Sequence, residues 1–318
     1  MELRLIFVFT DMILPLALGY FLHRKGILSD AANNLIIKAN IIFFITLLAL
    51  LSFWILPLSP SILILPTFGI ILTVVPAILA KIFFVRSYSD VLDQGSYMMS
   101  AMLSNIGTLG GLCAFILYDE VGYAVIQLVA MLQNMMFILI CLPLAKYYRA
   151  KADLTSAEAH VKFSRDMFLT WNQLGVVGMI VGLALNFFGV ARPESLGTIF
   201  QILIHVSAWF ALLPVGYLMN FKKAQAWYRK ALSLVPLHFI LLPLAIYLPA
   251  KILFAEPMLV NILLLAAATP SAINAVLAAR INRLNVDFTI ASFLMTTAIF
   301  LLVLFPLFFL YVTHGGGF

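Results

Sequence analysis

The chain has 318 residues, of which 64% are hydrophobic and only 10% are charged. A soluble domain typically carries about 25% charged residues, so this composition excludes an ordinary water-soluble fold. The net charge is +6, and in so apolar a chain it indicates basic cytoplasmic loops rather than a nucleic-acid partner. Cys113 and Cys141 both lie in apolar segments, which indicates neither a disulfide framework nor a metal site.

Long apolar segments recur from one end of the chain to the other. Each is long enough to cross about 30 Å of hydrocarbon as a helix. We therefore expect an all-α polytopic membrane protein embedded in a lipid bilayer, with ten transmembrane helices. They are expected at residues 3–22, 35–56, 62–84, 95–117, 121–145, 171–190, 196–218, 231–252, 258–280 and 286–312.

The basic residues fall mainly on one side of these ten segments. Successive connecting loops lie on alternate sides of the membrane. With that assignment, 16 of the 19 Lys and Arg residues lie on one side, and the other side has only Arg4, Arg192 and Lys251. Positively charged loops stay in the cytoplasm. We therefore expect both termini outside the cytoplasm, in a plasma membrane. The short loop at 146–170 favours the bacterial inner-membrane type.

The segments also divide into two halves that contain five helices each. We expect a first five-helix repeat at residues 1–145, a cytoplasmic loop at 146–170 and a second repeat at 171–318. An odd number of helices per half gives the halves opposite orientations, as in the inverted repeats of transporters. An offset of 165 residues aligns EVGYAV at 120–125 with NVDFTI at 285–290, and Asn105 with Pro270.

Two polar interruptions lie at matching places in these halves. SNIGTLGG, at 104–111, interrupts the fourth segment, and ATPSAINA, at 268–275, interrupts the ninth. Gly costs about 1 kcal/mol in a helix interior and Pro about 3, so we expect the breaks at Gly107, Gly110, Gly111 and Pro270. Small residues alone more often form packing faces, but paired breaks in two halves favour a midplane binding site.

Broken helices of this kind place half-helix N-termini near the centre of the membrane. Their free N–H groups carry partial positive charge and suit a carboxylate, and polar side chains beside them add donors. The expected substrate site consists of Asn105, Gly107, Thr108, Gly110, Pro270, Ser271 and Asn274. No cofactor or metal is expected.

Three ionisable residues within the segments are candidates for coupling to protons or sodium. Ionisable groups in membrane spans are functional hypotheses by default, and these are Asp11, His205 and His238. Asp11 can equally lie at the headgroup boundary as a helix cap, and a hydrogen-bonded structural role is the commoner one for a histidine. The 165-residue offset pairs His205 with Asn40.

Several stretches together resemble the auxin efflux carrier family. They are LPLALGYFLHRKGILSDAANNL near the start, SNIGTLGGLCAF followed by YDEVGYAVIQL, LGVVGMIVGLALNFFGV, and AATPSAINAVLAARINRLNVD near the end. The resemblance implies two inverted five-helix repeats with crossing fourth and ninth helices, an elevator-like movement against a scaffold, a homodimer and an organic-anion substrate. It also implies a substrate-facing role for Asn105 on the fourth helix, where the Gly that follows in the family motif corresponds to Gly110. In the ninth-helix motif, the family's Pro corresponds to Pro270 and its basic residue to Arg280.

Some positions depart from the family pattern. Leu112 and Ala275 stand where plant carriers have crossover prolines, so glycine is expected to break the fourth helix. The rival interpretations are a sodium-coupled symporter of the bile-acid type, a membrane sensor that binds without transporting, and a membrane enzyme. The chain has no HExxH, GxSxG or GxxxxGK[ST] motif, so we expect neither an enzyme nor an ATP-driven pump.

Overall fold

The computed structural model describes residues 6–153, 174–219 and 225–315. These residues are helical apart from turns and one isolated β-bridge. Six helices are long and apolar enough to cross a membrane: Asp30–Trp54, Pro60–Phe83, Ile106–Ala152, Ser195–Leu218, Leu234–Leu253 and Val286–Thr313. Two shorter apolar helices are Leu174–Phe187 and Pro257–Ala267. An all-α, membrane-type protein is confirmed; ten spans and an inverted repeat stay predictions.

The described helices form two compact units. Unit 1 contains the described residues of Met1–Leu58, Gly111–Gln127 and Arg165–Met219, and unit 2 contains those of Ser59–Gly110, Leu128–Ser164 and Asn220–Phe318. Each unit therefore draws on both halves of the sequence. The chain passes from unit 2 to unit 1 between Gly110 and Gly111, within the first polar interruption.

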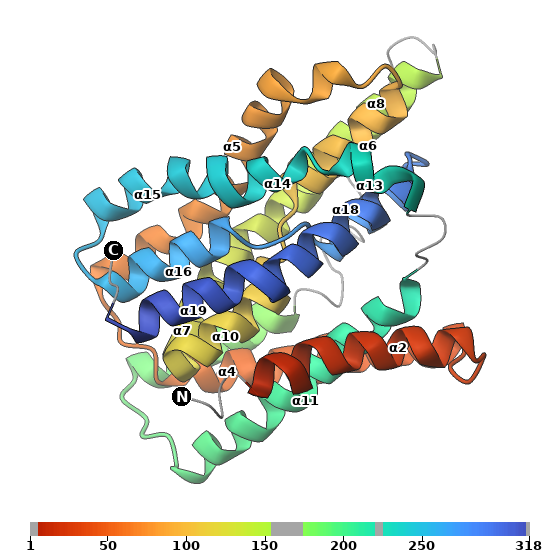
Figure 1. The fold of residues 1–318 in the computed structure, drawn as a ribbon. Coiled ribbons are helices and arrows are strands. Elements are labelled where there is room, and N and C mark those ends of the chain that lie inside the picture. The colour runs from red at the N-terminus through yellow and green to blue at the C-terminus, as the bar shows by residue number, and fades with distance from the viewer. Residues whose placement is uncertain (1–5, 154–173, 220–224, 316–318) are drawn as a thin grey trace. The chain divides into compact units, whose positions relative to one another are not determined.

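Unit 1 consists of helices that pack closely through glycine. Its elements are η1 (Val8–Ile13), α2 (Leu14–Arg24), α3 (Asp30–Ala39), η2 (Asn40–Ile45), α4 (Thr46–Trp54), the first part of α7 (Gly111–Met136), α10 (Leu174–Phe187) and α11 (Ser195–Leu218). Gly178 and Gly182 of α10 lie against backbone carbonyls of α4, where an added Cβ would overlap Thr46 and Leu50. α2 and α11 lie side by side, with Gly19 and Gly216 at their contact (Figure 1). Small residues allow such close approach in membrane helices.

A buried ion pair stabilises one end of unit 1. The Arg192 guanidinium donates to both carboxylate oxygens of Glu120, at 2.5 and 3.2 Å, and also to the Leu51 carbonyl oxygen. Both charged side chains are about one-tenth exposed. Removing one partner of such a pair leaves a buried charge and typically costs 3–5 kcal/mol, so this bridge holds α7, α4 and the α10–α11 connection together.

Unit 2 contains the larger number of elements. They are η3 (Pro60–Ile64), α5 (Leu65–Phe83), η4 (Val85–Ser87), α6 (Val91–Met102), η5 (Ile106–Gly110), the rest of α7, η6 (Phe137–Cys141), α8 (Leu142–Ala152), η8 (Gln225–Trp227), α13 (Tyr228–Ala231), α14 (Leu234–Pro236), η9 (Leu237–Leu241), α15 (Leu242–Leu253), α16 (Pro257–Ala267), α17 (Ile273–Ile281), α18 (Val286–Ile299), η10 (Phe300–Leu304) and α19 (Phe305–Thr313).

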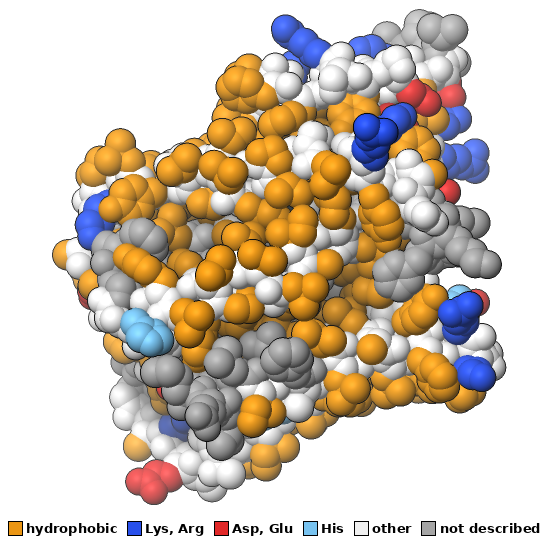
Figure 2. All heavy atoms as spheres, viewed as in Figure 1, with side chains coloured by type: hydrophobic (Ala, Val, Ile, Leu, Met, Phe, Trp, Pro, Cys, Tyr) orange, Lys and Arg blue, Asp and Glu red, His pale blue; other side chains and the backbone are white. Residues whose placement is uncertain are grey.

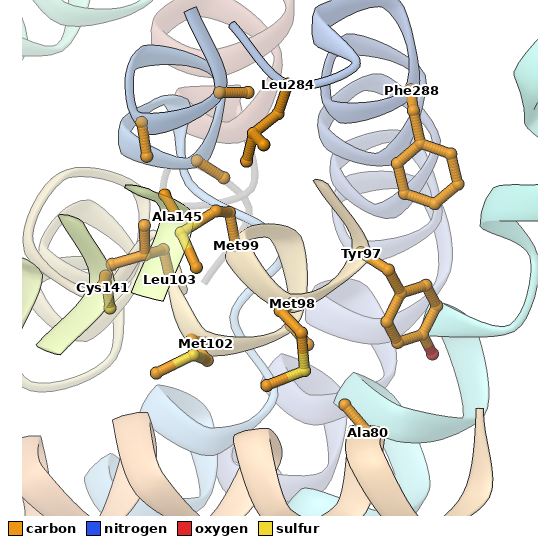
Figure 3. Close-up of a cluster of buried hydrophobic side chains, with 14 of the residues drawn as sticks. Ala80, Tyr97, Met98, Met99, Met102, Leu103, Cys141, Ala145, Leu284 and Phe288 are labelled. Carbon is orange, nitrogen blue, oxygen red and sulfur yellow. The ribbon is translucent and has the colours of Figure 1, made fainter. Parts of the chain in front are cut away.

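Helix α6 forms the centre of unit 2. Every residue from Gly95 to Met102 is buried, and Figure 3 shows Tyr97, Met98 and Met102 pointing to different sides of the helix. At its start, the buried Asp93 carboxylate accepts from Lys230 Nζ at 3.2 Å and from Asn285 Nδ2 at 2.7 Å. Packing on all sides and this polar contact fix the position of α6, and hence of the break that follows it.

Two predicted boundaries differ from the structure. Helix α8 continues to Ala152, so it enters the region predicted as a loop from residue 146; residues 154–170 of that loop lie outside the described residues. The predicted turn between the fourth and fifth segments is a kink within α7. Tyr118 and Asp119 leave helical geometry there, and Asp119 has a φ of 54°.

The surface is apolar over most of the helix flanks. Figure 2 shows hydrophobic side chains across most of the visible face, with Lys and Arg gathered near its margins. Exposed examples include Ile180 and Ile202 of unit 1 and Leu244 and Leu302 of unit 2. Water would penalise so much exposed apolar area, and lipid would not, which agrees with a membrane-embedded protein.

Glycine packing in unit 1 gives a direct test. We expect Gly178→Ala to destabilise the protein by about 1–3 kcal/mol, because overpacking is costly and the new methyl group would meet the rigid Thr46 carbonyl. Gly175→Ala in the same helix is the control, since its methyl group would meet only a side-chain methyl of Ile45, at 3.2 Å. Thermal unfolding in detergent measures both; equal midpoints would contradict the assigned packing.

Candidate functional site

Both predicted interruptions are real breaks in helices of unit 2. Helix α6 ends at Met102, Leu103 is extended (φ −107°, ψ 99°), and the chain becomes helical again in η5 at Ile106. In the second half α16 ends at Ala267 and α17 begins at Ile273. Two non-helical stretches, Leu103–Asn105 and Ala268–Ala272, thus interrupt otherwise apolar helices.

The two breaks bind each other through their backbones. Asn105 N donates to Pro270 O at 2.8 Å, and Ala272 N donates to Leu103 O at 2.7 Å. Ser104 and Ser271 lie between these bonds and form an antiparallel β-bridge. Because unsatisfied amides in hydrocarbon each cost several kcal/mol, this pairing lets both helices stay open. We call the two stretches together the crossing.

The expected role of glycine in the first break is wrong. The break precedes Gly107, Gly110 and Gly111, and Gly107 and Gly110 lie within the π-helical turn η5. Asn105 marks the boundary because its carbonyl accepts from Gly110 N at 2.9 Å and its side-chain oxygen from Leu109 N at 3.4 Å. Asn competes well for such local bonds at helix starts. Gly111 instead allows close packing, since a Cβ there would lie 3.1 Å from Gln127.

The second break lies where the sequence predicts it. Pro270 falls inside the non-helical stretch, and its carbonyl supplies one of the crossing acceptors. Leu112 and Ala275, which replace the crossover prolines of plant carriers, both lie inside helices. Neither break therefore needs a proline at those two positions.

Ser271 has a different role from the one expected. Its hydroxyl donates to the Ser100 carbonyl at 2.8 Å, and its backbone N donates to Thr296 Oγ1 at 3.2 Å. The side chain is fully buried. Ser271 therefore ties the crossing to α6 and α18 instead of presenting a donor to a substrate, and Ala272 N is likewise occupied by Leu103.

The backbone N–H groups that stay available to a substrate begin one residue after Ala272. Helix α17 starts without a side-chain cap, and within the described part of the chain the N–H groups of Ile273 and Asn274 have no acceptor. The Asn274 side chain is half-buried, Thr108 is exposed, and Asn105 is 8% exposed. The Ser104 hydroxyl is buried and has no partner among the described residues. Sequence reasoning did not single out Ser104, although it lies inside the SNIGTLGG stretch.

The three coupling candidates separate into two places. Asp11 and His205, 194 positions apart, form a pair in unit 1 with Asp11 Oδ2 2.6 Å from His205 Nδ1. The offset partner of His205, Asn40, instead accepts from Ser207 at 2.8 Å. His238 of η9 is buried in unit 2 beside the crossing, with Nε2 3.0 Å from Ser100 O and 3.4 Å from Ser271 Oγ.

No protein-family model matches the chain, and a search of curated proteins returned no match. The resemblance to auxin efflux carriers therefore stays a prediction, and the crossing itself is the main guide to function.

The hydroxyl of Ser271 can be tested as a structural tie. We expect Ser271→Ala to lower stability by about 1 kcal/mol or more, because it removes a buried hydrogen bond between two segments. Ser292→Ala is the matched control, since the buried Ser292 hydroxyl bonds only to Phe288 O of its own helix. Thermal unfolding of both variants decides the point, and an equal effect would mean that the tie across segments has no special weight.

Proposed function

We propose that this protein is a secondary transporter of small organic anions, with the substrate carboxylate bound at the crossing. The proposal includes a mono- or dicarboxylate or aromatic acid as substrate and export from the cell as the direction. It also includes the plasma membrane, of the bacterial inner-membrane type, as location, both termini outside, and a homodimer.

The observation that carries this proposal is the backbone pairing of two interrupted apolar helices. Unwound backbone at membrane depth occurs where it is buried in protein or lines a cavity, and transporters use such breaks for substrate sites. A packing role alone would not require two breaks, since continuous helices satisfy all their own amides. The cost of opening both helices is therefore better explained by a binding function.

The polarity of the crossing favours an anion. The uncapped start of α17 offers two N–H groups, from Ile273 and Asn274, and a helix N-terminus carries about half a positive charge. Such a field typically stabilises an anion by about 0.3–1 kcal/mol, and by up to about 2 kcal/mol in partly buried geometries. With the Asn105 oxygen bonded to Leu109, the donor that this side chain can offer is its amide nitrogen. No lysine or arginine occurs in either break, so binding would rest on dipoles and amide donors.

The division into two compact units supports alternating access. Unit 2 contains the whole crossing and its own buried core, and unit 1 has a separate glycine-packed core. We propose that unit 2 moves as the substrate-carrying body while unit 1 serves as the scaffold. The link between them in the first half is α7, which starts directly after the crossing at Gly111.

A ligand panel tests the substrate class. We expect purified protein to show a higher unfolding temperature with at least one carboxylate among acetate, benzoate, phenylacetate, succinate and malate. The corresponding amides should give no shift, because they lack the charge that a helix N-terminus stabilises. Running the panel with and without sodium separates a sodium-coupled symporter from the proposed carrier. Equal shifts with acids and amides would contradict anion recognition.

Asn105 gives the sharpest site test. We expect Asn105→Ala to weaken binding of the stabilising carboxylate by about 10- to 100-fold, since a hydrogen bond to a charged group is worth about 1.5–3 kcal/mol. Asn282→Ala is the control, because Asn282 lies in the same unit and bonds to Ala278 of its own helix. Flux into proteoliposomes should fall with Asn105→Ala alone. Unchanged binding and flux in Asn105→Ala would show that Asn105 is not part of the site. Binding without flux in the unaltered protein would instead indicate a sensor.

A further inference from the structure

The Asp11–His205 pair lies deep within unit 1. Asp11 is 5% exposed, and the His205 side chain is about one-quarter exposed. His205 is flanked by the rings of Phe7 and Phe115, with centroid distances of 4.3 and 6.1 Å. The pair therefore joins η1 to α11 in largely apolar surroundings.

The position of His205 along α11 indicates how far the pair would lie from the two surfaces of a membrane. Helix α11 runs from Ser195 to Leu218 and is one of the helices able to cross a membrane. At 1.5 Å per residue, His205 lies about 15 Å from the first residue and about 20 Å from the last. That is near the middle of a hydrocarbon layer about 30 Å thick. Asp11 lies 2.6 Å away, which favours the same depth for its carboxylate over a position at the headgroup boundary.

The charge of the pair depends on one proton. With one proton shared between carboxylate and imidazole, the pair is neutral overall; with none it carries −1, and with two it carries +1. A net charge at mid-membrane depth is costly. Geometry and charge together favour a pair that holds one proton, and gain or loss of a proton changes its net charge by one unit.

Other ionisable groups on the helices next to the pair lie farther along them. On α2, Tyr20, His23 and Arg24 follow Asp11 by nine or more residues, about 13 Å or more. On α11, Tyr217 follows His205 by 12 residues, about 18 Å, and Glu194 precedes the helix. The hydroxyl of Tyr217 donates to Asp30 of α3, which places Asp30 at that same distant end.

The remaining neighbouring elements add few charges. Lys38 of α3 is exposed, and η2 and α4 contain no ionisable side chain. The unit 1 part of α7 carries Cys113, Tyr118, Asp119, Glu120 and Tyr123. Glu120 is paired with Arg192, and Asp119 lies at the kink one turn beyond Phe115.

The donor set suits a proton better than sodium. Hard cations prefer several oxygen ligands, whereas here one partner of the carboxylate is an imidazole nitrogen. The nearby Thr10 hydroxyl lies 3.3 Å from Asp11 Oδ1 and 3.2 Å from the Ile6 carbonyl oxygen. An Asp–His pair instead provides two groups that exchange one proton.

We infer that Asp11 and His205 together form a proton-binding site, and that this site couples transport to the proton gradient. The coupling part rests on the proposed function. In each cycle one proton from water on one side forms an O–H or N–H bond in the pair, and that bond breaks to release the proton on the other side. The chain runs from Asn105 of the crossing through η5 into α7, where Phe115 contacts His205.

The first experiment needs no substrate. The unfolding temperature in detergent is measured from pH 5 to 9 for the unaltered protein, Asp11→Asn, His205→Gln and the double variant. We expect a pH-dependent step in the unaltered protein that each single variant and the double variant lose alike. Asp153→Asn is the control, because Asp153 pairs with Arg149 at the surface and its loss should leave the step in place. The double variant, with two neutral hydrogen-bonding groups, keeps the test valid if a single variant fails to fold.

The second experiment tests coupling in proteoliposomes, with the carboxylate that stabilises best in the panel and protein-free liposomes subtracted. One pH unit sustains about tenfold accumulation at one proton per carboxylate. Asp11→Asn should abolish this accumulation but keep exchange of labelled for unlabelled carboxylate. A pH step that persists in both single variants overturns the proton site, and accumulation that persists in Asp11→Asn overturns coupling. If no carboxylate binds at all, the proposed function fails while the first experiment still decides the proton site.

Discussion

Two backbone hydrogen bonds, Asn105 N to Pro270 O and Ala272 N to Leu103 O, are the contacts on which the rest of unit 2 depends. They satisfy amides that two broken helices would otherwise leave open, which in hydrocarbon costs several kcal/mol for each group. Around them, Ser271 bonds to Ser100, and Thr296 accepts from the Ser271 backbone. Ser271 thus anchors the crossing to α6 and α18, while the first N–H groups of α17 have no acceptor among the described residues.

The polar groups of the protein are concentrated in a few places. Asp93 in unit 2 joins α6 to Lys230 and Asn285, while unit 1 contains the Arg192–Glu120 and Asp11–His205 pairs. The Asp93 contact and the Arg192–Glu120 pair each contain a lysine or an arginine, and both hold helices together. The third pairs a carboxylate with a histidine at the middle of α11 and contains no lysine or arginine.

The sequence predicts the membrane class and the meeting of the two interruptions, because composition and the 165-residue offset are visible without coordinates. It does not predict where the first helix breaks. That point depends on acceptors and donors supplied by Pro270 and Ala272, and the glycines that looked decisive lie after the break. The partnership of Asp11 with His205 was also hidden, since the offset aligned His205 with Asn40, which bonds to Ser207 instead. Local propensity indicates where a helix is easily interrupted, and tertiary contacts determine at which of these residues it ends.

The crossing also has a consequence for how the chain is made. Leu103 and Asn105 leave the ribosome long before Pro270 and Ala272, so their backbone groups have no crossing partner while most of the protein is synthesised. Open amides are poorly tolerated in lipid, and contacts between distant parts of a chain form slowly because a long loop must close first. The stretch around Leu103–Asn105 would therefore stay near water, or in the insertion machinery, until residues 270–272 are made. Biogenesis of this protein would be limited by that late pairing, and a chain truncated before residue 270 would present an unfinished span to quality-control proteases.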